Sequence, residues 1–213
     1  MVSKLLITSF FILNSFFCLS QKDKFNSKLV PSKIGAYFGF GNEQNFIFDD
    51  SDYFYNTHYI KISFHYPLNH NTFQLELNLQ PQIHFIKHQL LNKYFVLQTD
   101  ENYEDKRVSF TKLKSMRLYA LQFELLAKRK VSKKIEAFAF VSIGPATVNR
   151  ETERLKKGFT FIENLGLGLS YSLNENIIAE IKPSFNHISN AQLRLPNSGY
   201  NILNLEIGLS IKL

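Results

Sequence analysis

Apolar and polar side chains alternate along most of this chain. In residues 73–85 (FQLELNLQPQIHF) every odd position except Pro81 is apolar, and every even position is polar. A period of two places neighbouring side chains on opposite faces of an extended strand. No segment beyond residue 20 has the 3.6-residue period of a helix, so the chain is predicted to be all-β. The eight predicted strands are 33–41, 59–68, 73–86, 115–130, 134–148, 158–173, 177–190 and 200–213, of which the fifth alternates least clearly.

The predicted strands are long, and their connections alternate in length. The longest, at 115–130 and 158–173, far exceed the usual mode of about 5–6 residues. Short turns alternate with long loops, as in bacterial outer-membrane barrels. The long loops are 42–58, 87–114, 149–157 and 191–199. We therefore predict an eight-stranded antiparallel transmembrane β-barrel of the outer-membrane type, its polar face packed inside. Alternation alone also fits a soluble lipocalin-like barrel, which is the main alternative.

The first twenty residues have the layout of a secretory signal peptide. Lys4 supplies a positive charge, residues 5–17 are mostly apolar, and residues 18–20 precede the expected cleavage before Gln21. The apolar run is short for a membrane span of about 20 residues, and bulky Phe17 disfavours cleavage as a lipoprotein before the following cysteine. We predict a signal peptide at 1–20, a single β-barrel domain at 21–213, and export to the outer membrane.

Composition excludes several kinds of chemistry. The only cysteine, Cys18, lies in the predicted leader, so the mature domain has no disulfide, zinc–thiolate cluster or thiol nucleophile. The histidines show no metal-ligand spacing with carboxylates, and no metal is expected. A formal net charge of +7 suggests anionic surfaces such as lipid phosphates as partners, and no nucleic acid. An ordinary basic surface that aids solubility is the alternative.

Residues 186–201 (NHISNAQLRLPNSGYN) carry the candidate chemistry. Strand parity places His187 and Ser189 on the same face as Ile181 and Phe185, the apolar face that we expect to contact lipid. Their spacing of two puts their backbones roughly 7 Å apart, within reach of a hydroxyl–imidazole hydrogen bond. With both termini in the periplasm, this strand ends at the external leaflet.

The hairpin that follows sets the register of the last two strands. If it is centred near Arg194, His187 lies opposite Asn201. Below that pair the opposed outward positions are apolar, and Pro183 within the strand implies a bulge or a lost ladder bond. The expected pairs are Phe185–Leu203, Pro183–Leu205, Ile181–Ile207, Ala179–Leu209 and Ile177–Ile211.

The string HISNAQLRLPNSGYN, near the end of a barrel sequence, resembles the serine–histidine motif of PagL-type lipid A deacylases, which are eight-stranded outer-membrane barrels. The resemblance implies that Ser189 is the nucleophile and His187 its general base. It also implies that Asn190 contributes to an oxyanion hole, helped by neighbouring backbone N–H groups. A serine hydroxyl needs an imidazole to take its proton, and prepositioned donors stabilise the oxyanion. The scheme requires no cofactor.

The third position of the triad departs from the family pattern, which has glutamate where this chain has Asn201. An amide can orient the imidazole but supplies no negative charge, and an Asp→Asn change in a serine protease triad lowers kcat about 10⁴-fold. Glu206 is a poor substitute because its parity points inward. The sequence leaves open a slowed enzyme, a loop acid such as Glu151 or Glu153 in this role, or an inactive protein.

The pattern and the resemblance together favour an outer-membrane serine esterase that removes an ester-linked acyl chain from lipid A. Its expected partners are lipopolysaccharide as substrate and the surrounding outer-membrane lipids, and the sequence leaves open whether it forms a homodimer. The alternatives are an inactive structural or lipid-binding barrel of the same fold, and a soluble lipocalin-like carrier.

Overall fold

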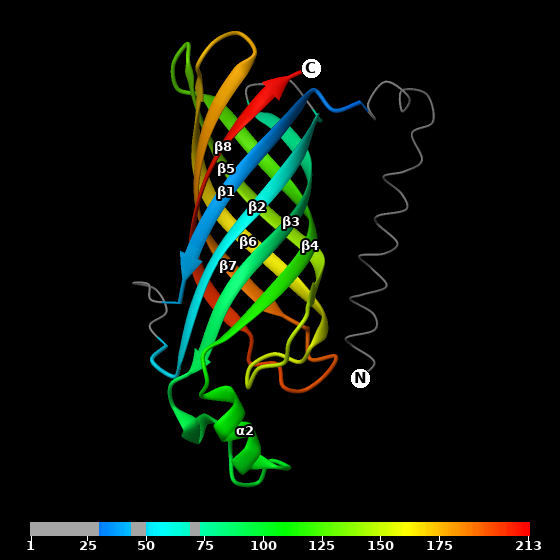
Figure 1. Cartoon of the computed structure of the whole chain (residues 1–213). Helices are drawn as coiled ribbons and strands as arrows, with labels where there is room; N and C mark the ends of the chain where they lie inside the picture. Colours follow the sequence, from blue (N-terminus) through cyan, green and yellow to red (C-terminus); the bar gives the residue numbers. More distant parts are fainter. Residues whose placement is uncertain (1–29, 44–49, 69–72) are drawn as a thin grey trace, which may run out of the picture.

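The chain forms a closed barrel in which each strand pairs with its neighbours in sequence and β8 closes onto β1 (Figure 1). The computed structural model describes residues 30–43, 50–68 and 73–213. The predicted signal peptide at 1–20 therefore lies outside the described residues. The strands are β1 (Lys33–Asn42), β2 (Tyr53–Pro67), β3 (Gln74–Leu90), β4 (Lys114–Lys130), β5 (Ile135–Val148), β6 (Gly158–Ser172), β7 (Ile177–Ser189) and β8 (Tyr200–Lys212).

The eight predicted strands are confirmed, with two differences at the end that carries the long loops. β2 begins at Tyr53 and not at residue 59, and β3 continues to Leu90 and not to 86. Both extensions turn aromatic side chains such as Tyr55 and His88 into the barrel. At the start of β2 apolar residues lie on both faces, and at the end of β3 the outward positions Lys87 and Gln89 are polar, so neither extension shows the apolar-out contrast of the other strands.

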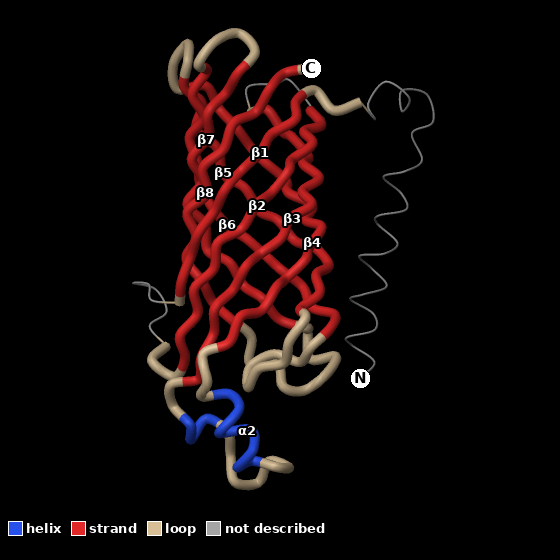
Figure 2. Tube along the Cα trace, viewed as in Figure 1, coloured by secondary structure: helices blue, strands red, loops and turns tan. Residues whose placement is uncertain are grey.

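The prediction that no helix follows the leader was wrong for the β3–β4 connection. This segment contains a short 3₁₀ turn, η1 (Lys93–Phe95), and one α-helix, α2 (Tyr103–Phe110), which project beyond the barrel rim (Figure 2). α2 buries only Phe110, so it has no apolar stripe for the sequence to reveal. Within the described residues, no helix is long and apolar enough to span a membrane.

The outer face of the barrel is an apolar band. Large apolar side chains from every strand point outward and are exposed, as a lipid-facing surface requires. They include Phe38, Ile60, Leu77, Phe123, Val141, Leu167, Ile181 and Ile207. The structure therefore supports the lipid-facing assignment of this face, because a water-soluble barrel would expose polar residues here.

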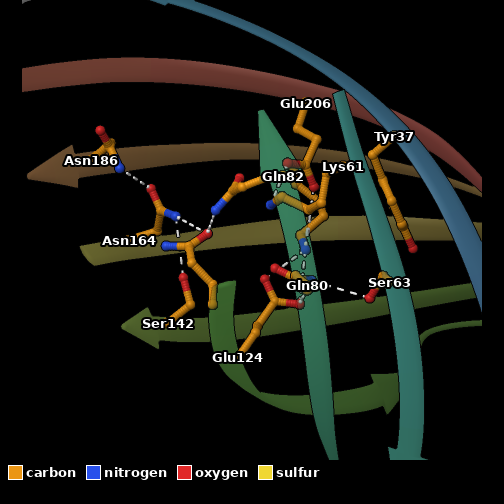
Figure 3. Close-up of polar contacts among 12 residues, drawn as sticks. Tyr37, Lys61, Ser63, Gln80, Gln82, Glu124, Ser142, Asn164, Asn186 and Glu206 are labelled. Carbon is orange, nitrogen blue, oxygen red and sulfur yellow. Dashed lines mark hydrogen bonds and ion pairs between the residues drawn. The ribbon is translucent and has the colours of Figure 1, made fainter. Parts of the chain in front are cut away.

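The middle of the barrel interior is filled by a network of charged and amide side chains. Lys182 contacts Glu124 at 2.7 Å, and Lys61 contacts Glu206 at 2.6 Å. Gln80 donates a hydrogen bond to the same Glu124 carboxylate (Figure 3). These side chains pair with one another away from water, so the interior is a packed polar core and not an open pore.

The interior at the long-loop end is apolar and aromatic. The sequence predicts only that the polar face packs inside the barrel. The buried side chains at this end form one cluster: Tyr53, Tyr55, Ile86, Met116, Leu118, Ala146, Val148, Leu155, Ile162, Ile188, Tyr200 and Ile202. Leu155 comes from the 149–157 loop, which folds inward over the mouth of the barrel. This layer packs directly behind the strand ends that carry His187 and Ser189.

Candidate functional site

The β7–β8 hairpin has the register expected from its sequence. His187 pairs with Asn201, and all five apolar pairs predicted below it are observed, including Pro183 with Leu205. The side chains of His187, Asn201 and Ser189 are all half-buried on the outer face. The three candidate residues therefore lie at the end of the barrel that carries the long loops, on the side that faces lipid.

A hydrogen bond of 2.6 Å joins His187 Nδ1 to Asn201 Oδ1. An amide oxygen only accepts, so Nδ1 is the donor in this pair. In a neutral imidazole the other nitrogen, Nε2, is then left as a proton acceptor. The amide thus holds the tautomer that a general base for Ser189 needs. Among the described residues, no hydrogen bond joins His187 and Ser189, and such contacts often form only once substrate is bound.

Asn190 shapes the loop that follows Ser189. Its backbone N–H donates to Asn197 Oδ1 at 2.6 Å, and its side-chain Nδ2 donates to the Arg194 carbonyl at 2.7 Å. The next two residues, Ala191 and Gln192, have left-handed φ values of 53° and 60°. Such angles at non-glycine residues persist only where the surroundings hold them. Within the described structure neither of their N–H groups has an acceptor, so both remain available as donors in the loop that follows Ser189.

Gly199 closes the loop against the site, and sequence reasoning gave it no role beyond its place in the motif. Its φ is +70°, and a Cβ here would lie 2.6 Å from the Ile188 carbonyl oxygen and 3.4 Å from both His187 Cε1 and Ser189 Cβ. The Pro-Asn-x-Gly sequence was the available signal, because glycine is the default residue for a left-handed position.

Replacing Gly199 by alanine is expected to lower both stability and activity. The left-handed conformation costs about 1–2 kcal/mol for a residue with a Cβ, and the backbone contact forces the loop away from His187. We expect activity at this candidate site to fall at least about tenfold, since displacements near 1 Å can cost far more. Rates and urea unfolding of Gly199→Ala, compared with Ser198→Ala at the exposed neighbour, check this. Wild-type rates in Gly199→Ala would contradict it.

The 149–157 loop supports the β7–β8 hairpin from inside. The Gly199 N–H donates to the Arg154 carbonyl, and the Lys156 N–H donates to the Pro196 carbonyl, both at 3.1 Å. Thr152 shares a hydroxyl hydrogen bond with Tyr200, the residue before Asn201. The loop therefore fixes the C-terminal side of the 190–199 turn, a contact between distant segments that alternation could not predict.

The loop acids considered as a third triad member lie elsewhere. Glu153 is buried inside the barrel, where it contacts His88 at 2.8 Å. Glu151 pairs with Lys156 at 2.7 Å. Glu206 points inward to Lys61, as its parity predicted. None of these carboxylates is brought to His187.

One outward carboxylate was missed. Glu163 of β6 lies directly across from His187 in the β6–β7 ladder. Its signal in the sequence is plain, because it alone interrupts the apolar face that runs from Phe159 to Tyr171.

A closed eight-stranded barrel with a lipid-facing band and a histidine–serine pair at its long-loop rim defines an outer-membrane barrel with a candidate esterase site. A family model described as "Lipid A 3-O-deacylase (PagL)" matches residues 36–210. This chain belongs to that family.

Solved structures are similar to this chain at low sequence identity. The crystal structure of the outer membrane enzyme PagL is 14% identical with a TM-score of 0.54, covering 85% of this chain and 99% of that one. Neisserial surface protein A is 13% identical (TM-score 0.42; 85% and 96% covered), and Ail from Yersinia pestis is 11% identical (TM-score 0.38; 84% and 99% covered). No curated protein matches the sequence.

Proposed function

We propose that this protein is an outer-membrane serine esterase that removes an ester-linked acyl chain from lipid A. The observation that carries the proposal is the hydrogen bond between His187 Nδ1 and Asn201 Oδ1, on the lipid-facing side and two residues from Ser189. A membrane-embedded ester can reach this face, whereas the packed interior is closed to it. Family membership supports the substrate class, and export through a signal peptide at residues 1–20 is part of the proposal.

The first half of the reaction forms an acyl-enzyme. Ser189 Oγ attacks the ester carbonyl carbon while its proton passes to His187 Nε2. The tetrahedral intermediate then collapses, the bond to the sugar oxygen breaks, and Nε2 returns the proton to that oxygen. Asn201 keeps Nδ1–H in place throughout.

The second half releases the fatty acid. A water molecule attacks the acyl–Ser189 carbonyl as His187 Nε2 takes one of its protons, and the proton passes to Ser189 Oγ as the carboxylic acid leaves. In both halves the oxyanion needs fixed donors. We assign this role to Asn190 and to the free N–H groups of Ala191 and Gln192. One N–H of the Asn190 amide already holds Arg194, so the backbone donors carry the larger share.

Mass spectrometry of lipid A from cells that make the protein tests the proposal. Wild type is expected to give lipid A lighter by one acyl chain, and Ser189→Ala and His187→Ala are expected to leave lipid A intact. Heat-modifiable electrophoretic mobility, a property of folded barrels, confirms that each variant is inserted. An unchanged lipid A profile with folded wild-type protein would instead support the inactive structural or lipid-binding barrel.

A further inference from the structure

Glu163 is the one carboxylate of the eight strands that points out of the barrel. All eight strands lie within the described residues, and their other glutamates share the inward parity. These are Glu76, Glu124, Glu136, Glu180 and Glu206. Glu163 is exposed between the outward side chains Phe161 and Leu165. An acid among lipid-facing apolar residues is unfavourable, and by default it indicates a function.

The position of Glu163 relative to the candidate site is fixed by register. His187 pairs with Glu163 across the β6–β7 ladder and with Asn201 across the β7–β8 ladder. Directly opposed residues on one face have Cβ atoms about 4.5–5.5 Å apart. His187 therefore stands between an amide on one side and a carboxylate on the other.

The interior side chains hold this register. Asn186, the residue before His187, donates from Nδ2 to the Glu163 carbonyl oxygen at 3.1 Å and to Asn164 Oδ1 at 2.6 Å. Figure 3 shows the second of these bonds, which joins β7 to β6 on the inner side of the barrel wall. The backbone of Glu163 is thus tied to the strand that carries the site.

The Glu163 carboxylate itself has no hydrogen-bond or ion-pair partner among the described residues. It forms no ion pair of the kind that Glu76, Glu124 and Glu206 make inside the barrel and Glu151 makes at its rim. Its side chain is long enough to reach a cross-strand neighbour, and His187 is the one polar neighbour directly opposite in the ladder.

We propose that Glu163 supplies the negative charge that Asn201 lacks, and so stabilises the His187 imidazolium that forms when Ser189 attacks the ester. This inference rests on the proposed function. Asn201 holds the tautomer, and Glu163 acts through His187 without touching the reacting atoms or taking the proton, which stays on the imidazole. The acid of a triad both orients the imidazole and stabilises its positive charge. Here Asn201 on β8 would do the first and Glu163 on β6 the second.

A double-variant cycle on the purified, folded barrel tests this. Glu163→Gln keeps the shape and removes the charge, and we expect kcat on lipid A to fall at least about tenfold with little change in KM. Asn201→Glu alone is expected to change kcat less than about threefold, because one carboxylate already faces His187. The combined Glu163→Gln/Asn201→Glu variant should return kcat to within about threefold of wild type. If Glu163 had a purely structural role, the Asn201→Glu change on β8 would not restore the kcat lost in Glu163→Gln.

The control is Glu175→Gln, the same change in the exposed turn between β6 and β7, which should leave kcat unaltered. Three results would overturn the inference: an unchanged kcat in Glu163→Gln while Ser189→Ala is inactive, a loss that Asn201→Glu does not restore, or a rise in KM alone, which would assign Glu163 to substrate binding. Full activity in Ser189→Ala would overturn the proposed function and this inference with it.

Discussion

Purified His187→Ala is expected to deacylate lipid A at least about 10³-fold more slowly than wild type. Without the imidazole, Ser189 loses the base proposed to take its proton, and loss of a triad histidine removes most of the catalysis that the triad provides. The rate in detergent micelles, followed by release of free fatty acid, measures the effect. KM should change little, because His187 acts on the reacting atoms and not on the bulk of the lipid.

His58→Ala is the matched control for this prediction. His58 is also an outward histidine, on β2, where its ring stacks on Phe85 with centroids 5.3 Å apart. Its removal deletes the same chemical group from the same kind of surface, so activity should stay near wild type. Equal losses in His58→Ala and His187→Ala would point to membrane embedding as the cause and not to acid–base chemistry.

Replacing Lys182 by methionine is expected to lower the free energy of unfolding by about 3–5 kcal/mol, the range seen when one partner of a buried ion pair is removed. The ammonium of Lys182 lies 2.9 and 2.7 Å from the two oxygens of Glu124, and Glu206 lies 3.5 Å away. After the change, Glu124 keeps, among the described residues, only the amides of Asn78 and Gln80 as hydrogen-bond donors. Urea unfolding in lipid vesicles measures the loss.

Two further variants separate the buried charge from other effects. Lys182→Met/Glu124→Gln removes both charges, and it should recover part of the lost stability because position 124 no longer buries an uncompensated carboxylate. Lys156→Met breaks the exposed pair with Glu151, and it should cost no more than about 1 kcal/mol. A Lys182→Met barrel as stable as wild type would contradict the packed ionic core.

Alternation predicted the barrel because the two faces differ most where lipid meets one side and the polar network fills the other. Prediction failed where that contrast disappears. At the start of β2, Tyr53 and Tyr55 point into an aromatic layer, so apolar residues occupy both faces. Helix α2 was not predicted because it packs little against the rest of the chain and so has no apolar stripe in its sequence.

Strand parity and the register of one hairpin were enough to predict part of the candidate site. They place His187 opposite Asn201 from the sequence alone, as the structure has it. The same reasoning, applied to the short turn around Glu175, places Glu163 opposite His187 as well, so this residue was accessible from the sequence. The support that Arg154 and Thr152 give to the 190–199 turn was not accessible, because loop contacts between distant segments follow no period.

Covalent labelling of the folded barrel tests the central claim most directly. A long-chain alkyl sulfonyl fluoride sulfonylates a serine whose hydroxyl is activated by a neighbouring base, and peptide mass mapping locates the modified residue. The account predicts modification of Ser189 with parallel loss of deacylation, and no modification of Ser189 in His187→Ala. A barrel that deacylates lipid A while Ser189 stays unmodified, or that loses activity through a label on another residue, would contradict it.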